Sequence, residues 1–277
     1  ISVNYSNKLK DLILGENNEN VNKNAPNFSS SSIDNGLFVQ QGDSTKSING
    51  QATYYYRGDV KNNYVEFGVN QKDSRGYRYD GKYFMGFPVF AKTGEPSLWR
   101  IVRINEDGSI RLISESLVNL TDNKWYAFNS NGNSSYIGSS IQTAINNWFT
   151  SFLNIDNNPI VISGTFCNDI SGNYTAAKTR ITNKNPSFVC PSTANTVKAK
   201  VGMITADEVM FAGGLTSKIT NNTTYLENLT KWYTMTPYSS TSVYAWISGS
   251  SLFLSSYTVS SSSAYGRMVI NISANAT

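Results

Sequence analysis

The sequence predicts an α+β fold made mainly of antiparallel strands, with two principal helices in one main domain. Three patterns indicate it: strand-like runs recur from residue 36 onward, residues 98–116 have a hairpin pattern, and residues 139–154 repeat apolar side chains at helical spacing. The chain of 277 residues is 39% hydrophobic and 13% aromatic, enough for a buried core. We therefore predict an N-terminal segment, residues 1–35, and a single α+β domain, residues 36–277.

The N-terminal segment is predicted to be a polar arm or stalk. Residues 1–15 are typical of a juxtamembrane stalk or a short amphipathic helix, and residues 16–35 are rich in Asn and Ser. Because the sequence begins with Ile1 rather than Met, we expect that a signal peptide or membrane anchor has been removed upstream, or that an expression boundary lies there.

The first part of the domain is predicted to be a series of strands. Aromatic and β-branched residues favour strands at residues 36–41, 52–56, 64–69 and 83–91. The clearest signal follows at 98–116, where two alternating runs flank a turn that ends in Asp107-Gly108. We expect a central hairpin here, with Trp99 in the core and with Arg100 or Arg103 facing solvent.

Two segments are predicted to be helical. Residues 140–153 present one apolar face after a capping serine, and residues 205–212 begin with Thr205 and Glu208 at the spacing of a capping box. Residues 199–204 are a predicted strand before the second helix. After residue 226 the chain returns to strands, in the runs LTKWYTMTP, SVYAWIS, SLFLSSYTVS and YGRMVINIS.

The two cysteines, Cys167 and Cys190, bracket a loop rich in Asn and Thr. An exposed polar loop with a cysteine at each end suits a disulfide in an exported protein, although two free thiols in the core are the alternative. Two cysteines without any His leave a zinc site half complete. We therefore predict a disulfide and no metal.

Composition excludes several functional classes. The absence of His excludes His-ligated zinc and both Ser-His-Asp and Cys-His catalysis. Lys+Arg and Asp+Glu number 14 and 13 in residues 1–115, and 9 and 6 in residues 116–277, so no basic face for nucleic acid is expected. No apolar run is long enough to cross a membrane. We expect no enzyme activity and no cofactor.

Two pairs of acidic residues and an Arg-Gly-Asp tripeptide, a sequence found in integrin-binding proteins, each have a structural explanation. Glu106 and Asp107 belong to the predicted hairpin turn, and Asp207 and Glu208 belong to the first turn of a helix, where carboxylates complement the dipole. The tripeptide at residues 57–59, Arg-Gly-Asp, follows a predicted strand and is read as a turn. None of the three is taken as a functional site.

Aromatic residues among Asn and Ser are the candidates for ligand binding. Flat apolar rings beside amides are typical of carbohydrate sites. The candidates are Trp125, Tyr126, Trp232, Tyr233, Tyr244 and Trp246. Placement in the core is the alternative for each of them.

The order of several blocks resembles a known group of proteins. The blocks are TYYYRGDVKNNYVEF, LWRIVRINEDGSIRLIS, a helix containing Trp-Phe, KVGMITADEVMFAGG, KWYTMTP and YGRMVINI, across roughly residues 50–277. They are similar to poorly characterised surface-anchored proteins of low-GC Gram-positive bacteria, some with a pilin-like N-terminus. The resemblance implies a C-type-lectin-like extracellular domain. The chain lacks the Glu-Pro-Asn type of calcium loop, so calcium-dependent sugar binding is not implied.

The sequence thus predicts a non-catalytic extracellular protein at the cell surface. Low charge, with 34 Asn, 37 Ser and 23 Thr, gives a surface with little electrostatic repulsion between identical copies. The first hypothesis is a self-associating subunit of a surface filament or coat, in which the N-terminal arm contacts another copy. The alternative is a monomeric adhesin or lectin-like module that binds glycans or host surface proteins.

Overall fold

The computed structural model describes most of the chain. It covers residues 8–29, 34–42, 50–71, 74–75, 89–91, 93–118, 126–153, 155–170, 174–217, 224–227, 230–247, 253–262 and 264–276. Within these residues the strands pair antiparallel and the helices are few and short, so the predicted α+β class is confirmed.

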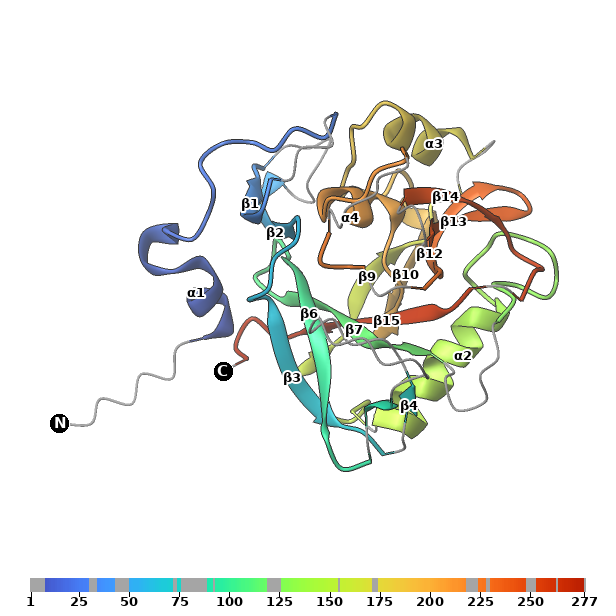
Figure 1. Ribbon diagram of the computed structural model, residues 1–277, viewed down its shortest axis with the longest axis horizontal. Helices are drawn as coiled ribbons and strands as arrows, with labels where there is room; N and C mark the ends of the chain where they lie inside the picture. Colours follow the sequence, from blue (N-terminus) through green and yellow to red (C-terminus); the bar gives the residue numbers. More distant parts are fainter. Residues whose placement is uncertain are drawn as a thin grey trace.

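The largest sheet is built around the hairpin and the C-terminal strand (Figure 1). In spatial order its strands are β1 (Gly36–Gln40), β2 (Thr53–Arg57), β6 (Pro96–Ile104), β7 (Ile110–Val118), β15 (Gly266–Ile272) and β11 (Val201–Gly202). Strand β3 (Tyr64–Val69) also pairs with β6, and β8 (Val161–Ile162) also pairs with β15. The chain therefore places its C-terminal strand beside a hairpin formed some 150 residues earlier.

The predicted hairpin is confirmed as β6 and β7. Ile104 pairs with Ile110 at the turn, and Gly108 takes a φ of 81°, a left-handed conformation that glycine adopts without strain. Trp99 is fully buried, and its Nε1 donates a hydrogen bond of 2.8 Å to the carbonyl oxygen of Phe67 in β3. The hairpin is the centre of the sheet because both its edges are paired.

Three smaller sheets surround the main one. They consist of β12 (Trp232–Ser239), β13 (Ser242–Ile247) and β14 (Phe253–Thr258), of β9 (Gly164–Cys167) with β10 (Thr196–Ala199), and of β4 (Ser74–Arg75) with β5 (Val89–Ala91). The predicted strands at 36–41, 52–56 and 64–69 correspond to β1, β2 and β3. Of the predicted strand at 83–91, residues 83–88 lie outside the described residues.

Both predicted helices are present. Helix α2 (Ser140–Trp148) continues through a π-helical turn, η3 (Phe149–Leu153), and Ser139 caps it by accepting a hydrogen bond from the backbone of Gln142. It packs on β15, where Gly266 leaves room: a Cβ there would lie 3.0 Å from Ile141 Cδ1. Helix α4 (Ala206–Phe211) has the complete capping box. None of the described helices is long and apolar enough to span a bilayer.

The segment between the cysteines corrects the expectation of an exposed loop. It contains helix α3 (Thr175–Thr182), in which Ala177 and Ile181 are both 1% exposed. These two apolar residues, one turn apart, give the helix a narrow buried side within a polar sequence. Two apolar residues are too few to predict a helix from the sequence alone.

The described part of the N-terminal segment lies against its own chain (Figure 1). Helix α1 (Leu9–Leu14) buries Ile13 and Leu14, and its Leu9 amide donates a 2.8 Å hydrogen bond to the carbonyl oxygen of Ala276. A short 3-10 turn, η1 (Glu16–Asn18), follows. Farther along, the Phe28 ring meets Phe211 of α4 edge to face at 5.4 Å. Residues 8–29 thus add buried area to the domain.

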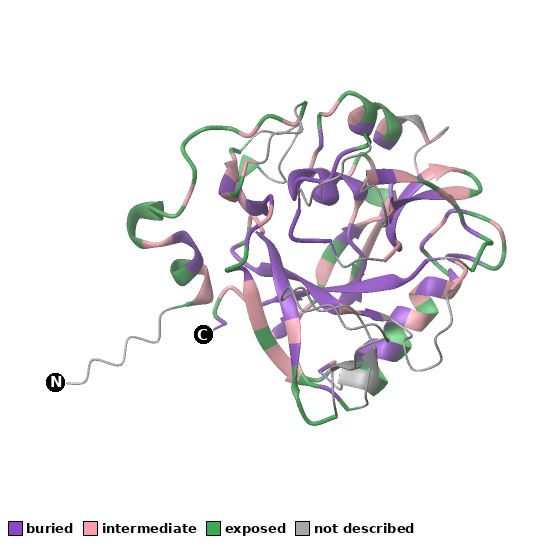
Figure 2. Cartoon of the chain, in the orientation of Figure 1, coloured by how far each residue is buried: buried purple, intermediate pink, exposed green. Residues whose placement is uncertain are grey.

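Most buried apolar side chains form one cluster, which includes residues of the main sheet, the three-stranded sheet and helices α2 and α4. Figure 2 shows which parts of the chain are buried. A second, aromatic cluster of Phe38, Tyr55, Phe188 and Phe211 lies under the N-terminal segment. A short 3-10 turn, η4 (Thr193–Asn195), comes directly before β10 in the sequence. The shared cluster holds the hairpin and α4 in one packed unit, and that junction contains the buried charges described next.

Candidate functional site

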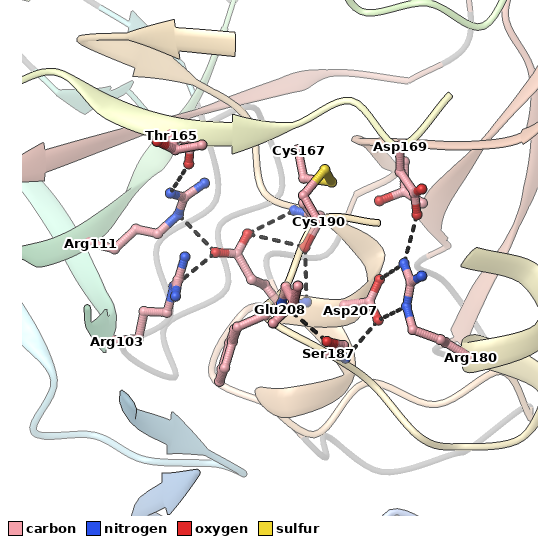
Figure 3. Close-up of a pocket in the computed structure, with 14 residues that line it drawn as sticks. Arg103, Arg111, Thr165, Cys167, Asp169, Arg180, Ser187, Cys190, Asp207 and Glu208 are labelled. Carbon is pink, nitrogen blue, oxygen red and sulfur yellow. Dashed lines mark hydrogen bonds and ion pairs between the residues drawn. A yellow bond between two sulfur atoms is a disulfide. The ribbon is translucent and has the colours of Figure 1, made fainter. Parts of the chain in front are cut away.

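Several buried charged side chains meet at the start of helix α4. Glu208 is 3% exposed and its Oε1 faces two arginines from the hairpin, Arg111 Nε at 2.8 Å and Arg103 Nε at 3.2 Å (Figure 3). Its Oε2 accepts a 2.9 Å hydrogen bond from the backbone of Thr205. Glu208 therefore completes its own helix cap and also joins α4 to β6 and β7.

The ionisation of this cluster follows from its surroundings. Burial alone would raise the pKa of Glu208, but Arg111, Arg103 and the hydrogen bonds from Thr205 outweigh it and lower that pKa below its ordinary value. Burial lowers the pKa of Arg111 to about 10, against the opposing effect of Glu208. At neutral pH Glu208 and Arg111 are therefore both charged, so Glu208 has no proton to donate.

A second ion cluster holds the disulfide loop. Arg180 of α3 binds both oxygens of Asp207, at 2.8 Å from Nε and 2.9 Å from Nη2, and its Nη2 also donates to Asp169 at 2.6 Å. The Ser187 amide donates to the same Asp207 carboxylate at 2.9 Å. Adjacent carboxylates of α4 thus anchor two different parts of the chain, as Figure 3 shows.

The space between the two clusters is small. It has a volume of about 30 Å³ and is lined by the arginines, the α4 carboxylates and the disulfide. Such a volume holds about one water molecule. Since the carboxylates at its wall are already occupied by arginines, this cavity has a structural role and no room for a substrate.

A larger cleft lies on the other side of Arg103 and Arg111. Its volume is about 260 Å³, and it is formed by the β6–β7 turn, the start of β9, β10 and the end of β15. Within the described chain, four buried polar atoms of residues lining it have no hydrogen-bond partner: Arg103 Nη1, Asn105 Oδ1, Arg111 Nε and Asn271 Nδ2. Each of these atoms has less than 1 Å² of accessible surface, so it lies behind the surface of the cleft.

The prediction that Arg100 or Arg103 faces solvent is wrong. Arg100 is 1% exposed and Arg103 is 6% exposed, because both faces of the hairpin are covered. Arg100 Nε pairs with Glu115 Oε1 at 2.5 Å, and Arg103 pairs with Glu208. A register shift between Ile101 and Arg103 interrupts the alternation along β6, so Arg100, paired with Ile113, and Arg103, paired with Arg111, lie on the same face of the sheet.

The structure places most of the candidate ligand-binding aromatics in the core. Trp232, Tyr233 and Trp246 are 0% exposed, and Tyr244 is 3% exposed. The Trp232 and Trp246 rings stack at 6.2 Å, and Trp246 Nε1 donates to Glu227 Oε2 at 2.7 Å. Buried rings offer no face to a sugar, so these four act in packing here.

Of the two remaining aromatic candidates, the structure describes Tyr126 alone. Tyr126 is half-buried, and its carbonyl oxygen accepts a hydrogen bond from the Tyr233 hydroxyl. Trp125 lies outside the described residues.

In the Arg-Gly-Asp sequence, Arg57 is 2% exposed and donates to the carbonyl oxygen of Met210 at 2.7 Å. That tripeptide is therefore a structural turn.

The predicted disulfide between Cys167 and Cys190 is present, with the Cα atoms 5.5 Å apart and a sequence separation of 23. Replacing both cysteines by serine is expected to lower the free energy of unfolding by roughly 3.5 kcal/mol, because the loop gains freedom in the unfolded chain. Guanidinium unfolding with and without reductant measures this: reductant should destabilise the natural protein and leave the double variant unchanged. Two free thiols titrated in the unreduced, denatured protein would contradict the bond.

Comparisons with known proteins identify no relative: no family model, no curated protein and no solved structure matches the chain. Among the described residues, no group of three or more Cys, Asp and Glu side chains is arranged to hold a metal ion. The cleft-lining residues that sequence reasoning did not single out as candidates include Arg103, Asn105, Arg111 and Asn271. One signal was available for two of them, because Arg103 and Arg111 occupy mirrored positions across the predicted turn and pair directly in the sheet.

Proposed function

We propose that this chain is an exported, non-catalytic binding module that takes a small polar ligand in the cleft beside the β6–β7 turn. The observation that carries the proposal is the cleft itself, which has a volume of about 260 Å³ and a polar lining. Its exposed lining residues include Asp107, Ser163 and Lys198. These side chains can donate hydrogen bonds to a polar ligand and accept hydrogen bonds from it.

The arrangement of charge supports a binding role over a catalytic one. A general acid or base needs a pKa near the working pH and access to a substrate. Glu208 has a lowered pKa and is held by two arginines, and Asp207 is held by Arg180 on both oxygens. These carboxylates stabilise the charged form of their partners and keep the loops in place.

The disulfide supports an exported protein, because such bonds persist in oxidising compartments. The C-type-lectin-like character that the motifs imply belongs to the same proposal. Its support is the α+β class, with a central hairpin, two main helices and a C-terminal strand that returns to the sheet. Extracellular lectin-like domains are binding modules, which agrees with the cleft.

The contacts of the N-terminal segment favour the monomeric alternative over the filament subunit. A subunit that assembles through this segment needs it free to reach a neighbour. Here α1 is joined to the C-terminal residues by the Leu9–Ala276 hydrogen bond, and Phe28 packs on Phe211. Both contacts are made within one chain, so part of the surface of the N-terminal segment is already buried and is not available to a second copy.

The full-length chain is expected to sediment as a monomer, and a panel of small polar compounds is expected to contain at least one that raises its melting temperature. A ligand at 100 times its dissociation constant adds about 2.7 kcal/mol of stability, which is a shift of several degrees in a domain of this size. Sedimentation velocity and thermal melts with sugars, amino acids and carboxylic acids measure both. Concentration-dependent particles without any ligand shift would instead favour the structural-subunit hypothesis.

A further inference from the structure

We propose that the cleft beside the β6–β7 turn binds a small zwitterion, a molecule with one ammonium group and one carboxylate, of the size of a free amino acid. This inference rests on the proposed binding function and names the ligand class of that site. It uses two exposed lining residues of opposite charge, Asp107 and Lys198, which lie on different elements of the fold.

Lys198 supplies the positive charge. It lies in β10, where it pairs with Thr165 of β9, and it is exposed. Within the described chain its ammonium group forms no hydrogen bond and no ion pair. An ammonium group has three donors and no acceptor, so a ligand carboxylate can pair with it without displacing a protein group.

Asp107 supplies the negative charge from the β6–β7 turn. Its Oδ1 accepts hydrogen bonds from Ser109, at 2.9 Å from the backbone amide and 2.5 Å from the hydroxyl. Its Oδ2 has no hydrogen-bond partner among the described residues. Ser109 therefore holds one oxygen of the carboxylate in place, and the other oxygen can accept from a ligand ammonium group.

The other charged residues that line the cleft already have partners. Arg103 and Arg111 both face Glu208 Oε1, at 3.2 Å and 2.8 Å. Glu106 lies 3.8 Å from Arg103 Nη1. Within the described chain, the lining thus keeps one cation and one anion without an ion-pair partner.

A zwitterion is the kind of ligand that pairs with both of these charges. A ligand with a carboxylate alone would pair with the lysine but bring like charge towards the aspartate, and a ligand with an ammonium group alone has the reverse conflict. An uncharged ligand would form only neutral hydrogen bonds through its own groups, and hydrogen bonds between two charged groups are roughly twice as strong as neutral ones. The balance of unpaired charge therefore favours a ligand that carries both signs.

The two walls that carry these charges are joined to each other. Arg111 Nη1 donates a 3.1 Å hydrogen bond to the carbonyl oxygen of Thr165, which connects β7 to β9. In the β6–β7 turn, Asn105 Nδ2 donates to Asn271 Oδ1 at 3.0 Å, and a Cβ at Gly164 of β9 would collide with that Asn271 amide. The fold therefore sets the separation of the walls before a ligand binds, which reduces the ordering cost of binding.

The volume of the cleft limits the size of the ligand. At about 260 Å³ it is slightly below the roughly 300 Å³ at which sites for drug-sized ligands begin. Ser163 and Thr165 are exposed in its lining, so their hydroxyls can also pair with a ligand carboxylate or side chain. One free amino acid fits this space better than a longer peptide.

The test combines two variants of the full chain that each remove one charge from the cleft. Lys198→Gln removes the cation. Asp107→Ser removes the anion and leaves a hydroxyl that can accept from the Ser109 amide. Lys23→Gln and Glu66→Gln are the matched controls, at exposed positions outside the cleft. Circular dichroism verifies that all four variants fold.

The probes are amino acids and derivatives that lack one of the two charges. Glycine, β-alanine and γ-aminobutyrate place the ammonium group and the carboxylate at increasing separations. The N-acetyl derivative of each lacks the ammonium group, and the amide derivative lacks the carboxylate. Saturation-transfer NMR and titration measure the binding of each probe to each protein.

We expect at least one of these amino acids to bind the natural protein, with affinity reduced about fivefold or more by each cleft variant and changed within about twofold by each control. Lys198→Gln should not weaken the amide derivative further, and Asp107→Ser should not weaken the N-acetyl derivative further. The reason is that each derivative already lacks the group that pairs with the substituted residue.

A derivative that binds as tightly as its parent amino acid would overturn the zwitterion assignment, and so would equal losses in the cleft variants and the controls. If no amino acid binds, but another polar compound does and Ser163→Trp in the cleft lining weakens it, the binding function stands and this ligand class is wrong. If no compound of any class binds, the proposed function fails as well.

Discussion

Replacing Glu208 by Gln is expected to lower the free energy of unfolding by about 3–5 kcal/mol, the usual cost of removing one partner from a buried ion cluster. Arg103 and Arg111 would keep their charges, at 6% and 2% exposure, without the carboxylate that faces both of them. The side-chain carbonyl oxygen of the new glutamine could still accept the hydrogen bond from the Thr205 backbone amide, so the helix cap is partly kept. Chemical unfolding of the two proteins at pH 7 measures the difference.

The cost of this substitution should depend on pH. The folded pKa of Glu208 is below its ordinary value of 4.5, so its stabilising effect is complete above that value and is lost as the pH falls through the folded pKa. The difference between the natural protein and Glu208→Gln should therefore shrink on acidification below about pH 4.5. A constant difference from pH 7 to pH 3 would show that the ion pairs are not its source.

Glu66→Gln is the matched control for this prediction. Glu66 is an exposed residue of β3, at the surface of the same sheet. Surface substitutions of this kind change stability by no more than about 0.5 kcal/mol. A comparable loss in both variants would mean that the charge change, rather than the buried arginines, controls the result.

Replacing Trp99 by Ala is expected to lower the free energy of unfolding by about 3–5 kcal/mol, because it leaves a cavity in the centre of the hairpin. It also removes the donor for the carbonyl oxygen of Phe67, which is bonded at 2.8 Å by Trp99 Nε1. Guanidinium denaturation followed by far-UV circular dichroism measures the loss. A loss under about 1 kcal/mol would place Trp99 outside the packed core.

Leu12→Ala provides the comparison for the tryptophan variant. Leu12 is 59% exposed on α1, so little apolar surface is removed from the core when its side chain is shortened. Its expected effect is within about 0.5 kcal/mol. The contrast separates a cavity effect from a general loss of hydrophobic side chains.

The elements that sequence reasoning predicted are those with a strong local signal. Asp107-Gly108 specifies the turn between β6 and β7, Thr205 and Glu208 specify the start of α4, and Ser139 with the apolar repeat specifies α2. Each signal spans only a few residues and depends on backbone geometry that neighbours alone determine. Helix α3 was not predicted, because its narrow apolar side depends on what packs beneath it.

The candidate ligand-binding residues were harder to predict. The aromatic candidates were selected by residue type, but a Trp or Tyr is equally suited to a core, and burial is a property of the whole fold. The disulfide was predicted because spacing, loop composition and an exported setting agreed. The cleft residues have no motif, since they are arginines and asparagines from strands and turns distant in sequence.

The sequence by itself determined the α+β class, the hairpin, the two capped helices, the disulfide and the absence of histidine chemistry. Only the tertiary structure decided where the buried charges and the residues of the candidate cleft lie. Arg103 meets Glu208 across 105 residues, and Asn105 meets Asn271 across 166. The physical reason is that an arginine is buried only where a distant carboxylate compensates its charge, and an amide has an unpaired atom only where the surrounding chain leaves one.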